Sequence, residues 1–72
     1  MPTKTKPAGR AARLRESRST VRAALDDIDA SPADLAEAIG VSRSTVTRWL
    51  AGERILSAAA RRALEAVVKE WR

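Results

Sequence analysis

The sequence contains no cysteine and no histidine. Disulfide bonds are therefore excluded, and a zinc site is not expected because no thiolate or imidazole ligand is present. Nucleophilic catalysis by a Cys–His or Ser–His pair is excluded as well. The carboxylates that remain fall on predicted helix surfaces or caps and form no pair suited to general acid–base catalysis. We therefore expect no enzymatic activity, no catalytic residue, no metal and no cofactor.

Aromatic residues are scarce, because Trp49 and Trp71 are the only two. Domains that bind RNA or single-stranded DNA stack bases on several exposed aromatic side chains, and two tryptophans are too few for such a surface. We therefore expect both tryptophans to pack in the core. No apolar run approaches the roughly 20 residues of a membrane span. The basic N-terminus also lacks the apolar region of a secretory signal. These absences predict a cytoplasmic protein that binds no membrane.

Positive charge is in excess, with 14 Lys and Arg against nine Asp and Glu, a net charge of +5 over 72 residues. Residues 1–30 carry seven basic and four acidic side chains, residues 31–51 two of each, and residues 52–72 five and three. The excess of +3 and +2 therefore flanks a neutral centre. Basic flanks are expected where phosphate contacts supply much of the affinity for nucleic acid. About half of these charges can equally serve solubility.

The central segment 31–52, SPADLAEAIGVSRSTVTRWLAG, predicts two short helices joined by a turn. Ser31 is a favourable N-cap, Pro32 suits the first helical position, and Asp34 stands where a capping box is nearly complete. Gly40 ends the first helix, because glycine enters the left-handed region without steric cost. Its apolar face consists of Leu35, Ala36 and Ile39.

The second helix of this segment runs from about Arg43 to Ala51, after Val41 in the turn and the N-cap Ser42. Helical spacing predicts that Val46, Trp49 and Leu50 are buried. The opposite face carries small hydroxyls and arginine but no acid, which suits a reader of the DNA major groove. We therefore predict four base-reading residues: Arg43, Ser44, Thr47 and Arg48.

This segment resembles the helix-turn-helix of the lambda repressor and Cro family, also called the XRE family of bacterial and phage regulators. With the family's motif started at Pro32, its small, glycine and apolar positions fall on Ala36, Gly40, Val41, Val46 and Trp49, and all five agree. The chain departs from the family at Pro32, where glutamine often bonds a DNA phosphate. An anchor there must come from backbone N–H groups or from Ser31.

The resemblance implies an all-α fold, a compact four-helix lambda-repressor-like domain over residues 11–72. The prolines, glycine and lysines near the N-terminus predict a disordered basic arm over residues 1–10, which either lies along the DNA or is a dispensable tail. It implies a small transcriptional regulator, Cro-like or a repressor, that binds double-stranded DNA sequence-specifically. It further implies a homodimer, at least on DNA, and no small-molecule ligand. The expected phosphate contacts are Ser31, Ser42, Thr45, Arg54, Arg10, Arg13, Lys4 and Lys6.

Two further helices are expected to flank the central segment. The first runs from about Ala11, or only from Ser19, to Ile28, and three aspartates near its end predict fraying, since the helix dipole disfavours them there. Its inward face should comprise Leu14, Val21, Ala24, Leu25 and Ile28. The last helix starts after the N-cap Ser57 and ends near Trp71.

Residues between these helices should seal the core, namely Ile55 and Leu56 in the connector after Gly52. On the last helix, the apolar residues form a face wider than one contact needs: Ala59, Ala63, Leu64, Val67, Val68 and Trp71. This excess predicts a symmetric contact between two copies through the C-terminal helix. The alternative is that this face closes the domain's own core and leaves a monomer that pairs only on DNA.

Other functions fit the same pattern. The chain could be an antitoxin or an excision-type DNA-binding factor, although no evident extra segment is available for a toxin. It could also be a protein-interaction helix-turn-helix module that docks the transcription machinery, or a helical hairpin with no nucleic-acid role. Arg43, Arg48 and the absence of acid on that helix face favour DNA.

Overall fold

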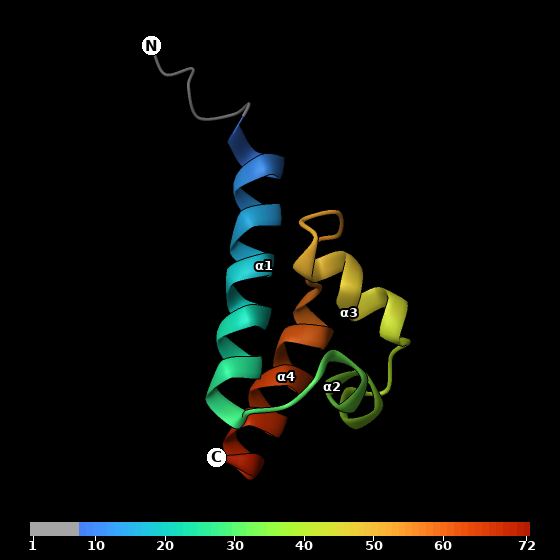
Figure 1. The fold of residues 1–72 in the computed structure, drawn as a ribbon. Helices are drawn as coiled ribbons and strands as arrows, with labels where there is room; N and C mark the ends of the chain where they lie inside the picture. Colours follow the sequence, from blue (N-terminus) through green and yellow to red (C-terminus); the bar gives the residue numbers. More distant parts are fainter. Residues whose placement is uncertain (1–7) are drawn as a thin grey trace.

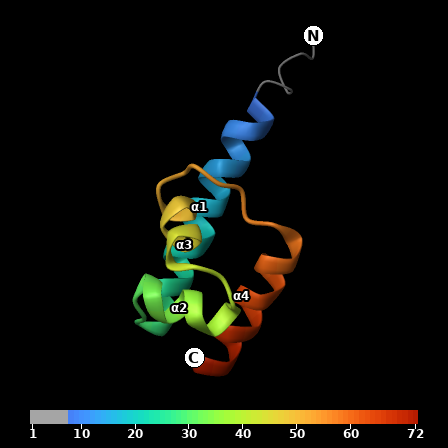
Figure 2. The same ribbon diagram turned by 90° about the vertical axis from the view of Figure 1, so that its right-hand side faces the viewer.

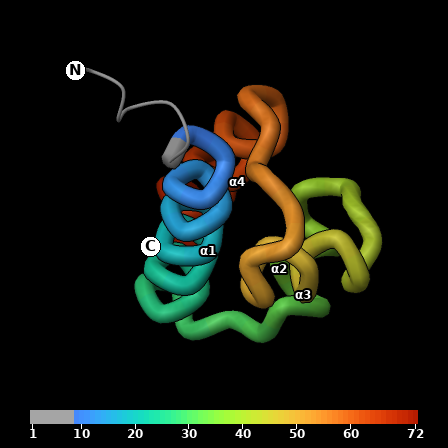
Figure 3. Tube along the Cα trace, turned by 90° about the horizontal axis from the view of Figure 1, so that it is seen from above, coloured from blue at the N-terminus to red at the C-terminus, as the bar shows by residue number. Residues whose placement is uncertain are grey.

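The computed structural model describes residues 8–72, which form four α-helices. These are α1 (Ala8–Ile28), α2 (Pro32–Ile39), α3 (Arg43–Leu50) and α4 (Ala58–Trp71). The predicted all-α fold is confirmed. Helix α1 packs against α3 and α4, and α2 packs against the same two helices. Seen from above, α1 and α4 lie on one side of the molecule, with α2 and α3 on the other (Figures 1 and 3). No helix in this part of the chain is both long and apolar enough to cross a membrane.

All four helices and the connector before α4 contribute to one hydrophobic core. Its centre is formed by Leu35 of α2, Val46 of α3 and Leu64 of α4, each at most 2% exposed. The remaining buried apolar residues are Val21, Ala24, Ala36, Trp49, Leu56 and Val67. Because the core is small, each of these side chains carries a large share of the stability of the domain.

Serine caps start three of the helices, as the sequence predicts. The Oγ atoms of Ser31, Ser42 and Ser57 each accept the backbone N–H three residues further on, at 3.2, 3.2 and 3.1 Å. The Ser31 N–H also donates to Asp34 Oδ2 at 3.4 Å, which completes the capping box. These bonds satisfy N–H groups that a helix leaves unpaired at its start.

Left-handed residues close three of the helix ends. Gly40 follows α2 with φ 79°, Gly52 follows α3 with φ 77°, and Asp29 follows α1 with φ 52°. After each one, the next N–H donates back to a carbonyl in the last turn: Val41 to Ala36 at 3.0 Å, Glu53 to Arg48 at 2.9 Å and Ala30 to Leu25 at 3.2 Å. Helix α1 ends at Ile28 as predicted, and this Schellman-type bond closes its end despite the aspartates. Fraying at this end stays a prediction.

The N-terminal half of α1 differs from the prediction. The helix begins at Ala8 rather than at Ala11 or Ser19, so the last residues of the predicted arm are helical. Leu14, predicted in the core, is half-exposed and does not pack against it. The reason is that the start of α1 extends past the other helices (Figures 1 and 2), where nothing among the described residues covers it. The rest of the predicted α1 face is buried or half-buried.

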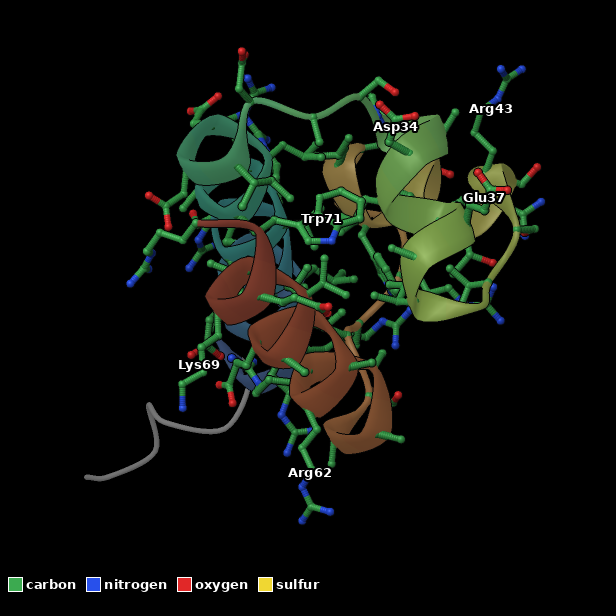
Figure 4. The ribbon with its side chains drawn as sticks, turned by 90° about the horizontal axis from the view of Figure 1, so that it is seen from below. Asp34, Glu37, Arg43, Arg62, Lys69 and Trp71 are labelled. Carbon is green, nitrogen blue, oxygen red and sulfur yellow. The ribbon has the colours of Figure 1, made fainter. Side chains whose placement is uncertain are left out.

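The two tryptophans also differ from each other. Trp49 is 3% exposed and packs in the core as predicted, but Trp71 is 45% exposed. The prediction for Trp71 is wrong because its turn lies at the lower end of α4, beyond most of the core (Figure 1). Seen from below, the indole lies between the ends of α1 and α2, with one side uncovered (Figure 4).

Candidate nucleic-acid interface

Helix α3 presents one face to solvent because its other face is anchored in the core. Val46 is fully buried and Trp49 nearly so, while Leu50 packs against the core from the side. The four predicted base readers are all exposed, and helical periodicity places them together on the outer side: Arg43, Ser44, Thr47 and Arg48. The structure therefore brings these four side chains together, with no acidic residue in α3.

The turn before α3 holds this helix rigidly against α2. Only Gly40, Val41 and Ser42 separate the two helices. The left-handed Gly40 reverses the chain, and Val41 is half-buried against the core. The predicted helix end, turn and cap are confirmed. A short, closed turn of this kind fixes the direction of the exposed face relative to the rest of the domain.

Thr47 has its hydroxyl hydrogen already engaged. Its Oγ1 donates to the carbonyl of Arg43 at 3.0 Å, one helical turn earlier. The outer side of the residue is left with an acceptor oxygen and a methyl group. Such a side chain can accept a hydrogen bond from the amino group of adenine or cytosine, or can contact the methyl group of thymine. Sequence periodicity predicts the position of Thr47 but not this restriction.

The hydroxyls at the start of α3 form a small network. Ser42 Oγ accepts the N–H of Thr45 and lies 2.9 Å from Thr45 Oγ1, which is half-buried. A hydroxyl has one hydrogen and two acceptor lone pairs, so one of the two hydroxyls can still donate to an outside acceptor. This pair stands beside Arg43 at the N-terminal end of the helix, where the helix dipole attracts anions.

The anchor expected at Ser31 is more restricted. Its backbone N–H is occupied by Asp34, and its Oγ accepts in return, so only the hydroxyl hydrogen remains for a phosphate. Seen from below, Asp34 and Glu37 both extend from α2 on this side of the molecule (Figure 4). The exposed Asp34 carboxylate beside Ser31 opposes a phosphate contact there, because like charges repel.

The other predicted phosphate contacts lie around the start of α1 and the connector before α4. Arg10 and Arg13 on α1 are exposed, as is Arg54 in the connector. The connector passes from the end of α3 across α1 to the start of α4 (Figure 2). Lys4 and Lys6 lie outside the described residues. The three arginines among the predicted phosphate contacts therefore lie at the start of α1 and in the connector that follows α3.

A buried serine that sequence reasoning missed joins α1 to this connector. Ser17 is 1% exposed, and its Oγ accepts the N–H of Leu56 at 2.8 Å. The signal was present in the sequence, since Ser17 stands one helical turn before Val21 on the inward face. A hydroxyl at such a position is expected to find a buried partner.

A wide groove lies away from this face. A groove of about 800 Å³ runs between α1 and α4, with an apolar floor that includes Ala24, Leu64 and Val68. Lys69 lines it, and Figure 4 shows Lys69 and Arg43 on opposite sides of the molecule. No group of three acidic side chains that could hold a metal ion occurs within residues 8–72.

One comparison with known proteins gives a match, and it includes α3. No curated protein and no solved structure matches the chain significantly. A model of the helix-turn-helix family matches residues 21–67, which cover the last eight residues of α1, all of α2 and α3, and most of α4. That family has a DNA-binding regulator fold and is generally non-enzymatic. The match extends over more than half of the chain and contains the turn and exposed helix described above. The chain therefore belongs to the lambda repressor/Cro-like family of helix-turn-helix, DNA-binding transcription regulators.

Proposed function

We propose that this protein is a small Cro-like regulator or repressor that reads the major groove of double-stranded DNA with residues 43–51. The observation that carries the proposal is the exposed, acid-free face of α3, held in place by Val46 and Trp49 on the buried side. A helix anchored in this way can enter the major groove without rearranging the domain.

The four side chains on this face have different roles in the proposal. Arg43 and Arg48 bind guanine, because a guanidinium can donate two hydrogen bonds to its O6 and N7. Ser44 bonds to a base or a phosphate. Thr47 accepts from an amino group or contacts a thymine methyl, since its own hydrogen is bonded to the Arg43 carbonyl.

The surrounding hydroxyls and basic residues hold the DNA backbone and set the position of α3. The proposed contacts are Ser42 and Thr45 at the start of α3, Arg54 in the connector, Arg10 and Arg13 on α1, Lys4, Lys6 and, more weakly, Ser31. Contacts of this kind add affinity that is independent of base sequence and falls with salt.

The operator is proposed to hold two copies of the protein. A single recognition helix covers only part of a turn of the major groove, and proteins of this architecture gain specificity by pairing on half-sites about 34 Å apart. The proposed setting is the cytoplasm of a bacterial cell or of a phage-infected host, because that is where such operators lie.

Two matched variants test this proposal after selection of binding sites from random duplex DNA. Arg48→Ala should cost about 1–3 kcal/mol on the selected site and relax the preference at one or two base pairs. Arg54→Ala should weaken binding equally for all sequences and reduce the slope of log K against log salt by about 0.9. If selection enriches no sequence, or Arg48→Ala keeps full specificity, α3 does not read bases and a protein partner is favoured instead.

A further inference from the structure

A small cleft lies where the start of α1, the connector and the start of α4 meet. Its volume is about 200 Å³. Its charged lining residues come from distant parts of the sequence, with Arg13 and Glu16 on α1 and Arg61 on α4. The fold therefore brings two arginines to one cleft. Sequence periodicity could not predict that Arg13 and Arg61 lie close together.

The floor of the cleft is rigid. Ser17 and Leu56 both line it, and the hydrogen bond of 2.8 Å between Leu56 N–H and Ser17 Oγ joins its two walls. Ser17 is 1% exposed and Leu56 is 5% exposed, so water does not compete strongly for this bond. This bond holds the connector, which leads directly into α4 and Arg61, against the part of α1 that carries Arg13.

The charges of the cleft favour an anion. Arg13 is exposed and Arg61 is half-exposed. Within residues 8–72, the one ion pair joins Arg72 to Asp27 at 2.8 Å, at the other end of α1 and α4. Glu16 lines the same cleft without reaching ion-pair distance of either arginine. Two cations and one anion therefore leave the site with a net positive charge.

We propose that Arg13 and Arg61 hold a backbone phosphate of the bound DNA in this cleft. The proposal rests on the DNA-binding function proposed above and adds Arg61 to its contacts. The cleft is lined by Ile55 and Leu56 of the connector, which directly follows α3 and carries the exposed Arg54. The Arg13 side of the cleft lies outside residues 21–67, the part that the family model matches. Only the α1 side of this clamp therefore lies outside the family match, whereas Ile55, Leu56 and Arg61 lie within it.

The experiment compares four charge changes in the full chain, measured as DNA affinity over a range of salt concentrations. Arg61→Gln should reduce the slope of log K against log salt by about 0.9, which is about eightfold in affinity per tenfold change in salt. Glu16→Gln should have the opposite sign and tighten binding, because it removes the carboxylate beside the phosphate. Lys69→Gln and Glu65→Gln are the matched controls, since both residues line the groove between α1 and α4 instead.

The outcomes separate this proposal from the function on which it rests. If wild type binds DNA but Arg61→Gln behaves like Lys69→Gln, only net charge matters and the clamp is overturned. If wild type binds no DNA, the proposed function and the clamp fail together. A titration with inorganic phosphate tests the other source of the same chemistry: a phosphate-induced shift in wild type, with an unchanged DNA slope in Arg61→Gln, would assign the cleft to free phosphate. Melting curves check that each variant is folded.

Discussion

Asp29 is the one residue other than glycine with a left-handed backbone in residues 8–72. Gly40 and Gly52 adopt the same left-handed conformation at the ends of α2 and α3. An L-residue pays a steric penalty in this region that glycine does not, although aspartate tolerates it better than most. Asp29 also places a negative charge at the C-terminal end of α1, where the helix dipole disfavours it. The end of α1 is therefore a position at which the sequence is not optimised for stability.

Replacement of Asp29 by glycine should stabilise the domain by about 1 kcal/mol, because it removes the backbone penalty and the unfavourable charge. Asp29→Asn separates the two causes and should give only the charge contribution, about 0.3–1 kcal/mol. Urea unfolding monitored by circular dichroism measures both values. A lower free energy of unfolding for Asp29→Gly would show that the aspartate side chain stabilises the turn.

The reverse change at Gly40 should destabilise. An added Cβ at Gly40 meets no atom within 4 Å, so the cost of Gly40→Ala is purely conformational. We expect a loss of about 1 kcal/mol and unchanged helix content, since only the φ of 79° is strained. The folded variant should bind DNA normally at low temperature. A folded variant with lost affinity would show instead that the turn shifts α3.

At the scale of the helices, the start of a helix was predictable from the sequence where a capping residue marks it. Ser31, Ser42 and Ser57 cap as expected, because an N-cap depends only on residues within one turn. The start of α1 carries no such cap in the sequence, and its position was missed. The outer face of α3 was predictable too, because periodicity alone separates it from Val46 and Trp49.

Features that depend on long-range packing were not predictable. The exposure of Leu14 and Trp71 depends on where neighbouring helices end, which no local pattern encodes. The same holds for Ser17, whose partner Leu56 is distant in sequence, and for the shared cleft of Arg13 and Arg61. The candidate site was therefore predictable on α3 but not where separate elements meet.

The bond between α1 and the connector gives a prediction for Ser17. Ser17→Ala leaves the buried N–H of Leu56 without its partner, which should cost about 1–3 kcal/mol of stability. Ser19→Ala on the exposed side of the same helix is the control and should stay within about 0.5 kcal/mol of wild type. Thermal unfolding measures both. Equal stability of the two variants would mean that another acceptor or water replaces Ser17.

At the scale of the whole molecule, charge is divided between two ends. The starts of α1 and α4 and the connector carry arginines, whereas the lower end in Figure 1 carries most of the acidic residues. Seven of the nine acidic residues lie in three places: in α2, in the C-terminal halves of α1 and α4, and in the loop that follows α1. They are Asp26, Asp27, Asp29, Asp34, Glu37, Glu65 and Glu70. Such a division orients a protein as it approaches DNA, with the acidic ends of α1 and α4 turned away.

This division also bears on how two copies pair. Leu64 and Val67 close the domain's own core, so the apolar excess predicted on α4 is reduced to half-exposed positions and Trp71. Trp71 is the one large apolar side chain that is exposed in residues 8–72. It lies at the acidic end, where two approaching copies repel each other at low salt. A contact through Trp71 is therefore expected to be weak in solution and effective on DNA, where two adjacent half-sites raise the local concentration.

Trp71→Ala tests this arrangement. On a palindromic operator the variant should bind at least about tenfold more weakly than wild type, because truncation of an interfacial tryptophan typically costs about 2 kcal/mol or more. On an isolated half-site the two proteins should bind equally. Lys69→Ala is the control, since Lys69 is exposed on the same turn but points away from Trp71 (Figure 4). Sedimentation equilibrium of wild type at micromolar concentration should show a monomer at low salt and association as salt rises, because screening weakens the repulsion between the acidic ends. Equal binding of wild type and Trp71→Ala to the palindrome would rule out pairing through the end of α4.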